Sequence, residues 1–268
     1  MRKGMLIVAL WALSGCNAHP PTKSTVAKTE VNQLSTAQEA PRVAAANYTA
    51  AAQINVQMGL EYLKQGHTAL AKSKLLHALK LDPSSAASHS AMAYFWETVQ
   101  ENKEAEREYR KALRLTKQKG AVYNNFATFL CRQNRYLEAD KTFKLALEDK
   151  SYPESANVFE NAGLCAAKNR NFAGAEHYLQ NALRHDPSKD DVLLELARVQ
   201  FSMGHLNQAK TSLEHYKKHH TPSAEAVYVE WKIAQALHNT EEAIALEFTL
   251  KSQYPDFLDE SKLEEASS

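Results

Sequence analysis

The sequence predicts an all-α protein in which six similar pairs of antiparallel helices stack one after another as an α-solenoid. Small residues recur at a period near 34 residues between residues 52 and 257, which is the spacing that a repeated helix pair produces. The 268 residues include only eight glycines and eight prolines, fewer than the many turns of a β architecture require. A formal net charge of +1 provides no basic surface field for nucleic acid. We therefore expect a helical protein and no nucleic-acid partner.

The first element, residues 1–15, has the composition of a secretory signal peptide. Arg2 and Lys3 precede an apolar run that is far shorter than the ~20 residues of a membrane-spanning helix. The run ends in Leu-Ser-Gly-Cys, which resembles the lipobox of bacterial lipoproteins and implies cleavage before Cys16 and lipid on that cysteine. Asn17 stands in place of the aspartate that retains such lipoproteins in the inner membrane, so the resemblance favours an outer-membrane anchor facing the periplasm. The alternative is an ordinary signal peptide that happens to contain a cysteine.

Residues 16–50 are expected to form a lipidated N-terminus and a flexible tether. The stretch is rich in small and polar residues and has Tyr48 as its only aromatic residue, so it cannot bury enough apolar surface to fold by itself. Roughly 30 residues of flexible chain reach about 30 Å. A helical extension from Val43 onward is the alternative, because the three alanines that follow favour helix.

Residues 51–257 are expected to form the repeat domain. Each unit carries small residues at two fixed positions, where they let two helix backbones approach closely, and proline ends the second helix of several pairs. The first position is occupied by Gly59, Ala93, Ala127, Gly163 and Ala197, and the second by Ala71, Ala105, Ala139, Ala175, Ala209 and Ala243. The six repeats are assigned to residues 52–85, 86–119, 120–155, 156–189, 190–223 and 224–257, and residues 258–268 are assigned to a C-terminal tail.

This pattern resembles the tetratricopeptide repeat. The resemblance implies a right-handed solenoid of about twelve helices, in which the first helix of each pair lines a concave face for extended peptides or partner helices. The sixth repeat is degenerate, because Trp231 replaces a small residue and Glu247 replaces a bulky one, as is typical of a terminal repeat. The alternative is a generic helical bundle with accidental periodicity, and the six-fold alanine ladder argues against it.

Positions 2, 5, 9 and 12 of each repeat, counted from its first residue, are expected to face this groove. Asn125 and Asn161 both occupy position 6, where an amide offers a donor and an acceptor to a peptide backbone. The alternative is that these amides hydrogen-bond within or between helices. The candidate partner-binding residues are Tyr94, Asn124, Asn125, Thr128, Glu160, Asn161, Leu164 and Arg198.

Two longer strings indicate a narrower family. Residues 123–131 (YNNFATFLC) and 159–165 (FENAGLC) both lie near the start of a repeat and end in cysteine. Together with the signal and the six repeats, they closely resemble the PilF/PilW family of type IV pilus biogenesis lipoproteins, which usually has glycine where Ala127 stands.

The resemblance to this family implies a pilotin-like outer-membrane lipoprotein. Such a protein helps the pilus secretin to reach or assemble in the outer membrane, or stabilises assembled pili. The implied partners are the pilus secretin or another pilus-machinery protein, and the membrane through the N-terminal lipid. A tetratricopeptide assembly lipoprotein for outer-membrane β-barrels or cell-wall enzymes is the alternative.

Cys131 and Cys165 are expected to form a disulfide bond. They occupy position 12 of the third repeat and position 10 of the fourth, an offset of about 200° around a helix, and neighbouring first helices touch through opposite faces. The oxidising periplasm favours the bond, and the alternative is two buried free thiols. Without a Cys-x-x-Cys motif, we expect a structural role for this pair.

No catalytic, metal or cofactor site is expected. The sequence has no nucleophile elbow, phosphate loop, His-Glu-x-x-His motif or Gly-rich dinucleotide turn. His215 and His219 are four residues apart but lack a third ligand at a fixed spacing. We therefore expect a protein that binds partners without enzymatic activity and without a small-molecule substrate.

Overall fold

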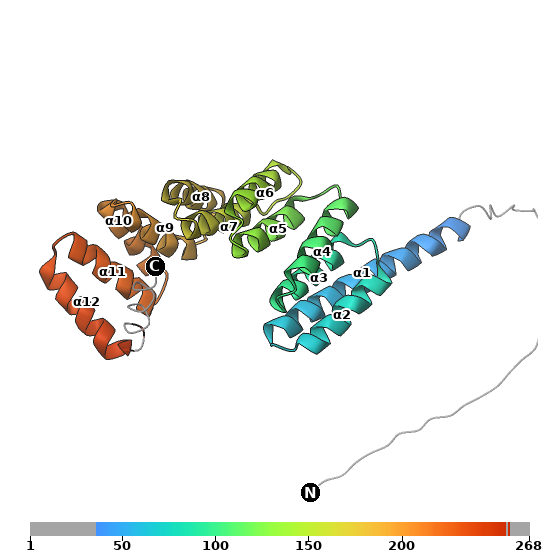
Figure 1. The fold of residues 1–268 in the computed structure, drawn as a ribbon, viewed down its shortest axis with the longest axis horizontal. Helices are drawn as coiled ribbons and strands as arrows, with labels where there is room; N and C mark the ends of the chain where they lie inside the picture. Colours follow the sequence, from blue (N-terminus) through green and yellow to red (C-terminus); the bar gives the residue numbers. More distant parts are fainter. Residues whose placement is uncertain (1–35, 256, 258–268) are drawn as a thin grey trace, which may run out of the picture. The chain divides into compact units, whose positions relative to one another are not determined.

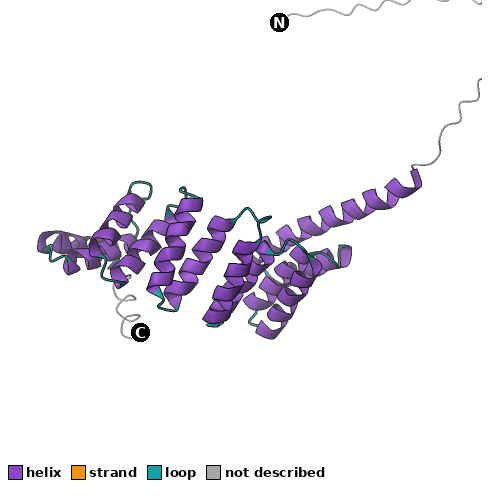
Figure 2. Cartoon of the chain, turned by 90° about the horizontal axis from the view of Figure 1, so that it is seen from above, coloured by secondary structure: helices purple, strands orange, loops and turns teal. Residues whose placement is uncertain are grey.

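The computed structural model describes residues 36–255 and residue 257. Within these residues the chain forms twelve helices and no strand (Figures 1 and 2). The helices are α1 (Thr36–Lys64), α2 (Thr68–Leu81), α3 (Ala86–Thr98), α4 (Asn102–Leu115), α5 (Gly120–Arg132), α6 (Tyr136–Glu148), α7 (Ser155–Lys168), α8 (Phe172–His185), α9 (Asp191–Ser202), α10 (Leu206–Lys217), α11 (Ala224–Ala236) and α12 (Thr240–Gln253).

The helices pair and stack in chain order. From α3 onward, each odd-numbered helix packs against the even-numbered helix that follows, and each pair contacts the next pair. Successive odd-numbered helices also contact one another, so they share one side of the stack (Figure 1). Each predicted repeat holds one helix pair, although α1 begins before residue 52 and α7 begins one residue before the fourth repeat. The prediction of a six-repeat α-solenoid is confirmed.

Helix α1 begins earlier than the predicted start of the repeat domain. The compact unit that contains the repeats starts at Ala44, and α1 itself starts at Thr36, so the last part of the expected tether is helical. The physical reason is composition, because alanine has the highest helix propensity and dominates residues 44–52. The expected signal peptide, Cys16 and the C-terminal tail lie outside the described residues.

The predicted small positions lie at the closest helix contacts. Five of the six alanines at the second position are completely buried, and a large residue four positions later is buried beside each of them. These pairs are Ala71 and Leu75, Ala105 and Tyr109, Ala139 and Phe143, Ala175 and Leu179, and Ala209 and Leu213. At the first position, a Cβ on Gly163 would lie 2.7 Å from the side chain of Leu179, so this helix pair is closer than alanine allows.

The two helices of each pair are joined by a turn that contains one residue in the left-handed region. After this residue, a backbone N–H donates to the carbonyl five residues earlier, as His67 does to Tyr62 at 2.8 Å, which caps the first helix with a Schellman motif. Four of the left-handed residues are not glycine. The six residues, with φ between 57° and 77°, are Gly66, Gln100, Asn134, Arg170, Gly204 and His238.

The last repeat has a small core of its own. Val227 and Leu250 are buried, and Tyr228 and Trp231 pack around them. Trp231 occupies the position that is small in the other repeats, and its ring is partly exposed, as the prediction of a degenerate terminal repeat implies. None of the helices in the described part of the chain is long and apolar enough to span a membrane.

Candidate functional site

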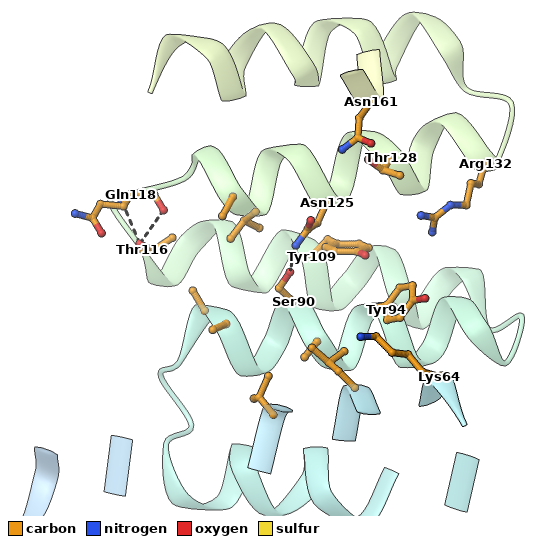
Figure 3. Close-up of a pocket in the computed structure, with 17 residues that line it drawn as sticks. Lys64, Ser90, Tyr94, Tyr109, Thr116, Gln118, Asn125, Thr128, Arg132 and Asn161 are labelled. Atoms are coloured by element: carbon orange, nitrogen blue, oxygen red, sulfur yellow. Dashed lines mark hydrogen bonds between the residues drawn. The ribbon is translucent and has the colours of Figure 1, made fainter. Parts of the chain in front are cut away.

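The first helices of the N-terminal repeats line a groove with a volume of about 680 Å³ (Figure 3). Residues of α1, α3 and α5 form most of its lining, and α7 contributes Asn161. The groove therefore runs across several repeats, as an extended or helical segment of a partner requires.

The floor of the groove is apolar and its rim is polar. Val56, Leu60, Ala91 and Val122 supply apolar surface, and no acidic residue is among the described residues that line the groove. Tyr94 is exposed and adds an aromatic ring. Apolar surface with a few polar groups is the composition of sites that bind protein segments.

The helical period explains which predicted residues line the groove. An α-helix has 3.6 residues per turn, so the points one, two and three turns after position 2 fall at about 5.6, 9.2 and 12.8. Positions 2, 6, 9 and 13 therefore lie on one face of the helix. Position 9 was predicted, and its residues Tyr94 and Thr128 line the groove. Position 13 was missed, and it supplies Lys64 and Arg132.

The two asparagines at position 6 lie in the groove but also contact neighbouring helices. The Asn125 side chain is exposed, and its amide donates to the Ser90 hydroxyl at 3.3 Å. The Asn161 amide donates to the side-chain oxygen of Asn124 at 3.1 Å. Asn124 is only 7% exposed and does not line the groove, so its amide joins α5 to α7. The structure therefore shows the hydrogen bonds between helices for both amides, and their contact with a bound peptide stays a prediction.

Glu160, Leu164 and Arg198 do not line this groove. Lys189 donates to Glu160 at 2.6 Å, and Arg198 pairs with Glu225 of α11. Leu164 is exposed on α7, beyond the groove. These three residues belong to the fourth and fifth repeats, whereas the groove is formed by the first three repeats and Asn161.

One end of the groove carries two cationic side chains. Lys64, Tyr94 and Arg132 lie together there, and Thr116 and Gln118 lie at the opposite end (Figure 3). Arg132 is held by an ion pair of 2.5 Å with Glu97, whose carboxylate is buried behind it. Burial raises the pKa of the Tyr109 phenol well above its usual range, and the nearby negative charge of Glu97 adds to the shift. Tyr109 therefore stays neutral in the floor of the groove.

Cys131 and Cys165 are joined in the structure. Their Cα atoms lie 5.8 Å apart, and the bond connects α5 to α7 beside the groove. Both cysteines are buried in one apolar cluster with Phe129, Leu130 and Val158. Oxidation of this pair in the cell remains a prediction.

His215 and His219 lie beside one another on the described surface, near Asp190. The described residues contain no group of three or more His, Cys, Asp and Glu side chains that is arranged to hold a metal ion. These two histidines therefore carry no argument for a metal site.

Comparison with known proteins identifies both the repeat and the family. Two tetratricopeptide repeat models match residues 52–85 and 166–229. The type IV pilus assembly protein PilF of Pseudomonas aeruginosa is 34% identical over 204 residues, which cover 76% of this chain and 81% of PilF.

Solved structures give the same result. The structure of P. aeruginosa PilF has a TM-score of 0.70 at 32% identity and covers 82% of this chain and 99% of its own. The crystal structure of PilW, described as a widely conserved type IV pilus biogenesis factor, has a TM-score of 0.70 at 30% identity and covers 76% of this chain and 94% of its own. The chain therefore belongs to the PilF/PilW family of tetratricopeptide repeat proteins.

Proposed function

We propose that this protein is a lipid-anchored scaffold for type IV pilus biogenesis in the outer membrane, and that it assists the pilus secretin to localise or multimerise there. The observation that carries the proposal is the similarity to PilF and PilW, which spans most of the repeat domain. A role in stabilising assembled pili is the other form of the same proposal. The protein acts by contact and catalyses no reaction.

The groove of the N-terminal repeats is the proposed partner-binding surface. Its apolar floor supplies the surface that a partner segment buries, and the amides of Asn125 and Asn161 hydrogen-bond to that segment. Tyr94 is the proposed aromatic anchor, because tyrosine is among the residues that contribute disproportionately to binding at interfaces.

The proposed anchor is lipid on Cys16, with the residues between Cys16 and α1 as the tether. Several acyl chains at about 0.8 kcal/mol per buried CH₂ give stable attachment to the outer membrane. The tether then lets the repeat domain reach partners in the periplasm.

Deletion of the gene tests the proposed function. We expect the amount of secretin multimers and the number of surface pili to fall, and re-expression of the native chain to restore both. Normal secretin multimers together with normal piliation would refute the proposal.

A groove variant tests the proposed binding surface. The double substitution Tyr94→Ala and Asn125→Ala should lower recovery of the secretin in a pull-down from outer membranes. Leu137→Ala is the matched control, because Leu137 is 79% exposed on α6 and does not line the groove. Recovery of barrel-assembly or cell-wall components without the secretin would favour the alternative pathway.

Cys16→Ala tests the proposed anchor separately. The variant should appear in the soluble or inner-membrane fraction, since it has no site for lipid. Unchanged fractionation with the outer membrane would exclude lipidation at Cys16.

A further inference from the structure

The two ends of the repeat stack expose apolar side chains at positions that contact a neighbouring repeat elsewhere in the molecule. We define the N-terminal edge as Ile54, Met58 and Leu70 of the first repeat, and the C-terminal edge as Ile244 and Phe248 of the sixth. Their exposed fractions are 57%, 37% and 49% for the first edge, and 64% and 72% for the second.

The N-terminal edge has the residues of a repeat that lacks a preceding neighbour. Ile54 and Met58 occupy positions 3 and 7. In the later repeats, position 3 is at most 5% exposed, and four of the five residues at position 7 are buried, because they pack against the preceding repeat. The buried residues are Ser88, Met92, Val122, Phe126, Val158, Ala162, Val192, Leu196 and Ala226.

Among the described residues, no repeat follows the C-terminal edge. Ile244 occupies position 21, and the residue at this position contacts the following repeat in all five preceding repeats. The contacts are Lys72 over the ring of Trp96, Glu106 with Arg135, Asp140 with Tyr178, Glu176 with Gln200, and Lys210 with Glu242. Phe248 occupies position 25, which is exposed in the five preceding repeats as well; in the second repeat, Arg110 at this position lies over Phe126 of the third.

The C-terminal edge is apolar, whereas the outer face of a terminal repeat in contact with water is expected to be polar. A terminal repeat usually has a polar outer face. Here position 21 changes from charged in the five preceding repeats to isoleucine, and position 25 becomes phenylalanine. Apolar side chains that lie together on a protein surface mark a site that another surface covers.

The C-terminal tail does not have the sequence to cover this edge as a seventh first helix. Continued in the same register, residue 258 is position 1. Positions 3, 7 and 8 are then Glu260, Glu264 and Glu265, where the other repeats place mostly apolar or small residues. Burying three carboxylates in that contact would be unfavourable.

The N-terminal edge of a second copy does have the required residues. It supplies Ile54 at position 3, Met58 at position 7 and Gly59 at position 8. It also supplies Leu70 at position 19, where Glu242 pairs with Lys210 of the preceding repeat. At a junction between copies, Ile244 and Leu70 would occupy the positions that Lys210 and Glu242 occupy between the fifth and sixth repeats. An apolar contact would therefore form there in place of an ion pair.

The charges of the two outer helices are also complementary. Helix α2 carries Lys74 and Lys80 and no acidic residue; its third lysine, Lys72, lies over Trp96 of the following repeat and faces away from this edge. Helix α12 carries Glu241, Glu242 and Glu247; Glu242 pairs with Lys210 of the preceding repeat, and Glu247 pairs with Lys251, the one base of this helix. Opposite charge on the two surfaces favours their encounter and the correct orientation.

We propose that the C-terminal edge of one copy binds the N-terminal edge of another, so that the repeat stack continues from copy to copy. The contact uses a different surface on each copy, and a contact of this kind forms open chains unless the rotation closes a ring. The proposal does not depend on which partner the groove binds.

Sedimentation velocity of residues 17–268, which include every described residue, tests the proposal. The average mass should rise above the monomer with concentration. The C-edge variant (Ile244→Lys, Phe248→Lys) and the N-edge variant (Ile54→Lys, Met58→Lys) should each remain monomeric. An equimolar mixture should form a 1:1 dimer and nothing larger, because only one junction is compatible. Leu137→Lys, an equally exposed apolar position away from both edges, is the control and should associate like the native chain.

Three results would overturn the proposal. The first is a native chain that stays monomeric up to about 1 mM, the range in which weak interfaces associate. The second is association that only one of the two edge variants abolishes, since this indicates a symmetric contact through a single edge. The third is a mixture of the two variants that remains monomeric while the native chain associates.

Discussion

At the scale of the residue, the turn inside each helix pair depends on one left-handed backbone conformation. A side chain in this region costs roughly 1–2 kcal/mol, and glycine avoids the cost. The two glycines, Gly66 and Gly204, are readily identified as turn residues from sequence. Gln100, Arg170 and His238 are not, because only the repeat period places them at the same position.

Arg170→Gly should stabilise the protein by about 0.5–1 kcal/mol. The substitution removes the left-handed penalty, and the extra freedom of glycine in the unfolded chain offsets part of the gain. Urea unfolding should show a higher midpoint with an unchanged slope. Gly204→Ala is the reciprocal control and should lower the midpoint; a lower midpoint for Arg170→Gly would contradict the argument.

At the scale of the element, ion pairs connect the second repeat to the third. The side chain of Arg135, at the start of α6, donates to Glu106 of α4 at 2.6 Å and to Glu138 of α6 at 2.7 Å. The hydrogen bond from Arg135 holds the pKa of Glu106 below its usual value of 4.5, and Arg110 adds to this shift. The ionised carboxylate therefore stabilises the contact between α4 and α6.

Glu106→Gln should lower the free energy of unfolding by about 1–2 kcal/mol at neutral pH. A carboxyl group whose pKa is lower in the folded protein than in the unfolded chain stabilises the fold at pH values above its pKa in the unfolded chain. This contribution is lost as the pH falls through its pKa in the folded protein. The difference between native chain and variant should therefore shrink below about pH 4.5. Urea midpoints measured across this range provide the test. Glu61→Gln, an exposed position 3.8 Å from Lys64, is the control, and an equal pH response in both variants would exclude the assignment.

The bond between Cys131 and Cys165 connects α5 to α7 across two repeats. Mass spectrometry of the non-reduced protein from the periplasm should recover a peptide that contains both cysteines. The double substitution Cys131→Ala and Cys165→Ala should lower the free energy of unfolding by about 3–4 kcal/mol, because it restores the entropy of a loop of 34 residues. Two thiols that react with an alkylating agent after unfolding of the oxidised protein would show that the bond does not form.

At the scale of the whole molecule, stability is the sum of the repeats and the contacts between neighbours. The ring of Phe126 packs against the ring of Tyr109 of the preceding repeat, with 5.5 Å between the ring centroids, and it stacks beside the ring of Phe129. Phe126→Ala should therefore cost about 3–5 kcal/mol and weaken the junction between α4 and α5 most. Hydrogen exchange should then show helices α1–α4 opening independently of α5–α12. Phe248→Ala, at an exposed position, is the control; one unchanged cooperative transition in Phe126→Ala would contradict this additive description.

The sequence predicts the fold of this molecule better than its site, and the reason is periodicity. Each helix pair is set by small residues and turns that repeat along the chain, and the turn and the second small residue, Ala243, recur even in the degenerate sixth repeat. The groove depends on single side chains that differ between repeats. Asn124 and Glu97 occupy positions expected to face a partner, yet Asn124 bonds to Asn161 and Glu97 holds Arg132. These pairings depend on which side chains meet across neighbouring helices, and a period of 34 residues carries no information about that.

The disulfide bond also determines how the molecule carries mechanical load. Tension applied between the first repeat and the last repeat passes directly from Cys131 to Cys165, and the chain between them, including α6, is shielded from extension. A separation of 34 residues corresponds to roughly 110–120 Å of extended chain. In the proposed scaffold, this link limits how far the repeat domain lengthens under load.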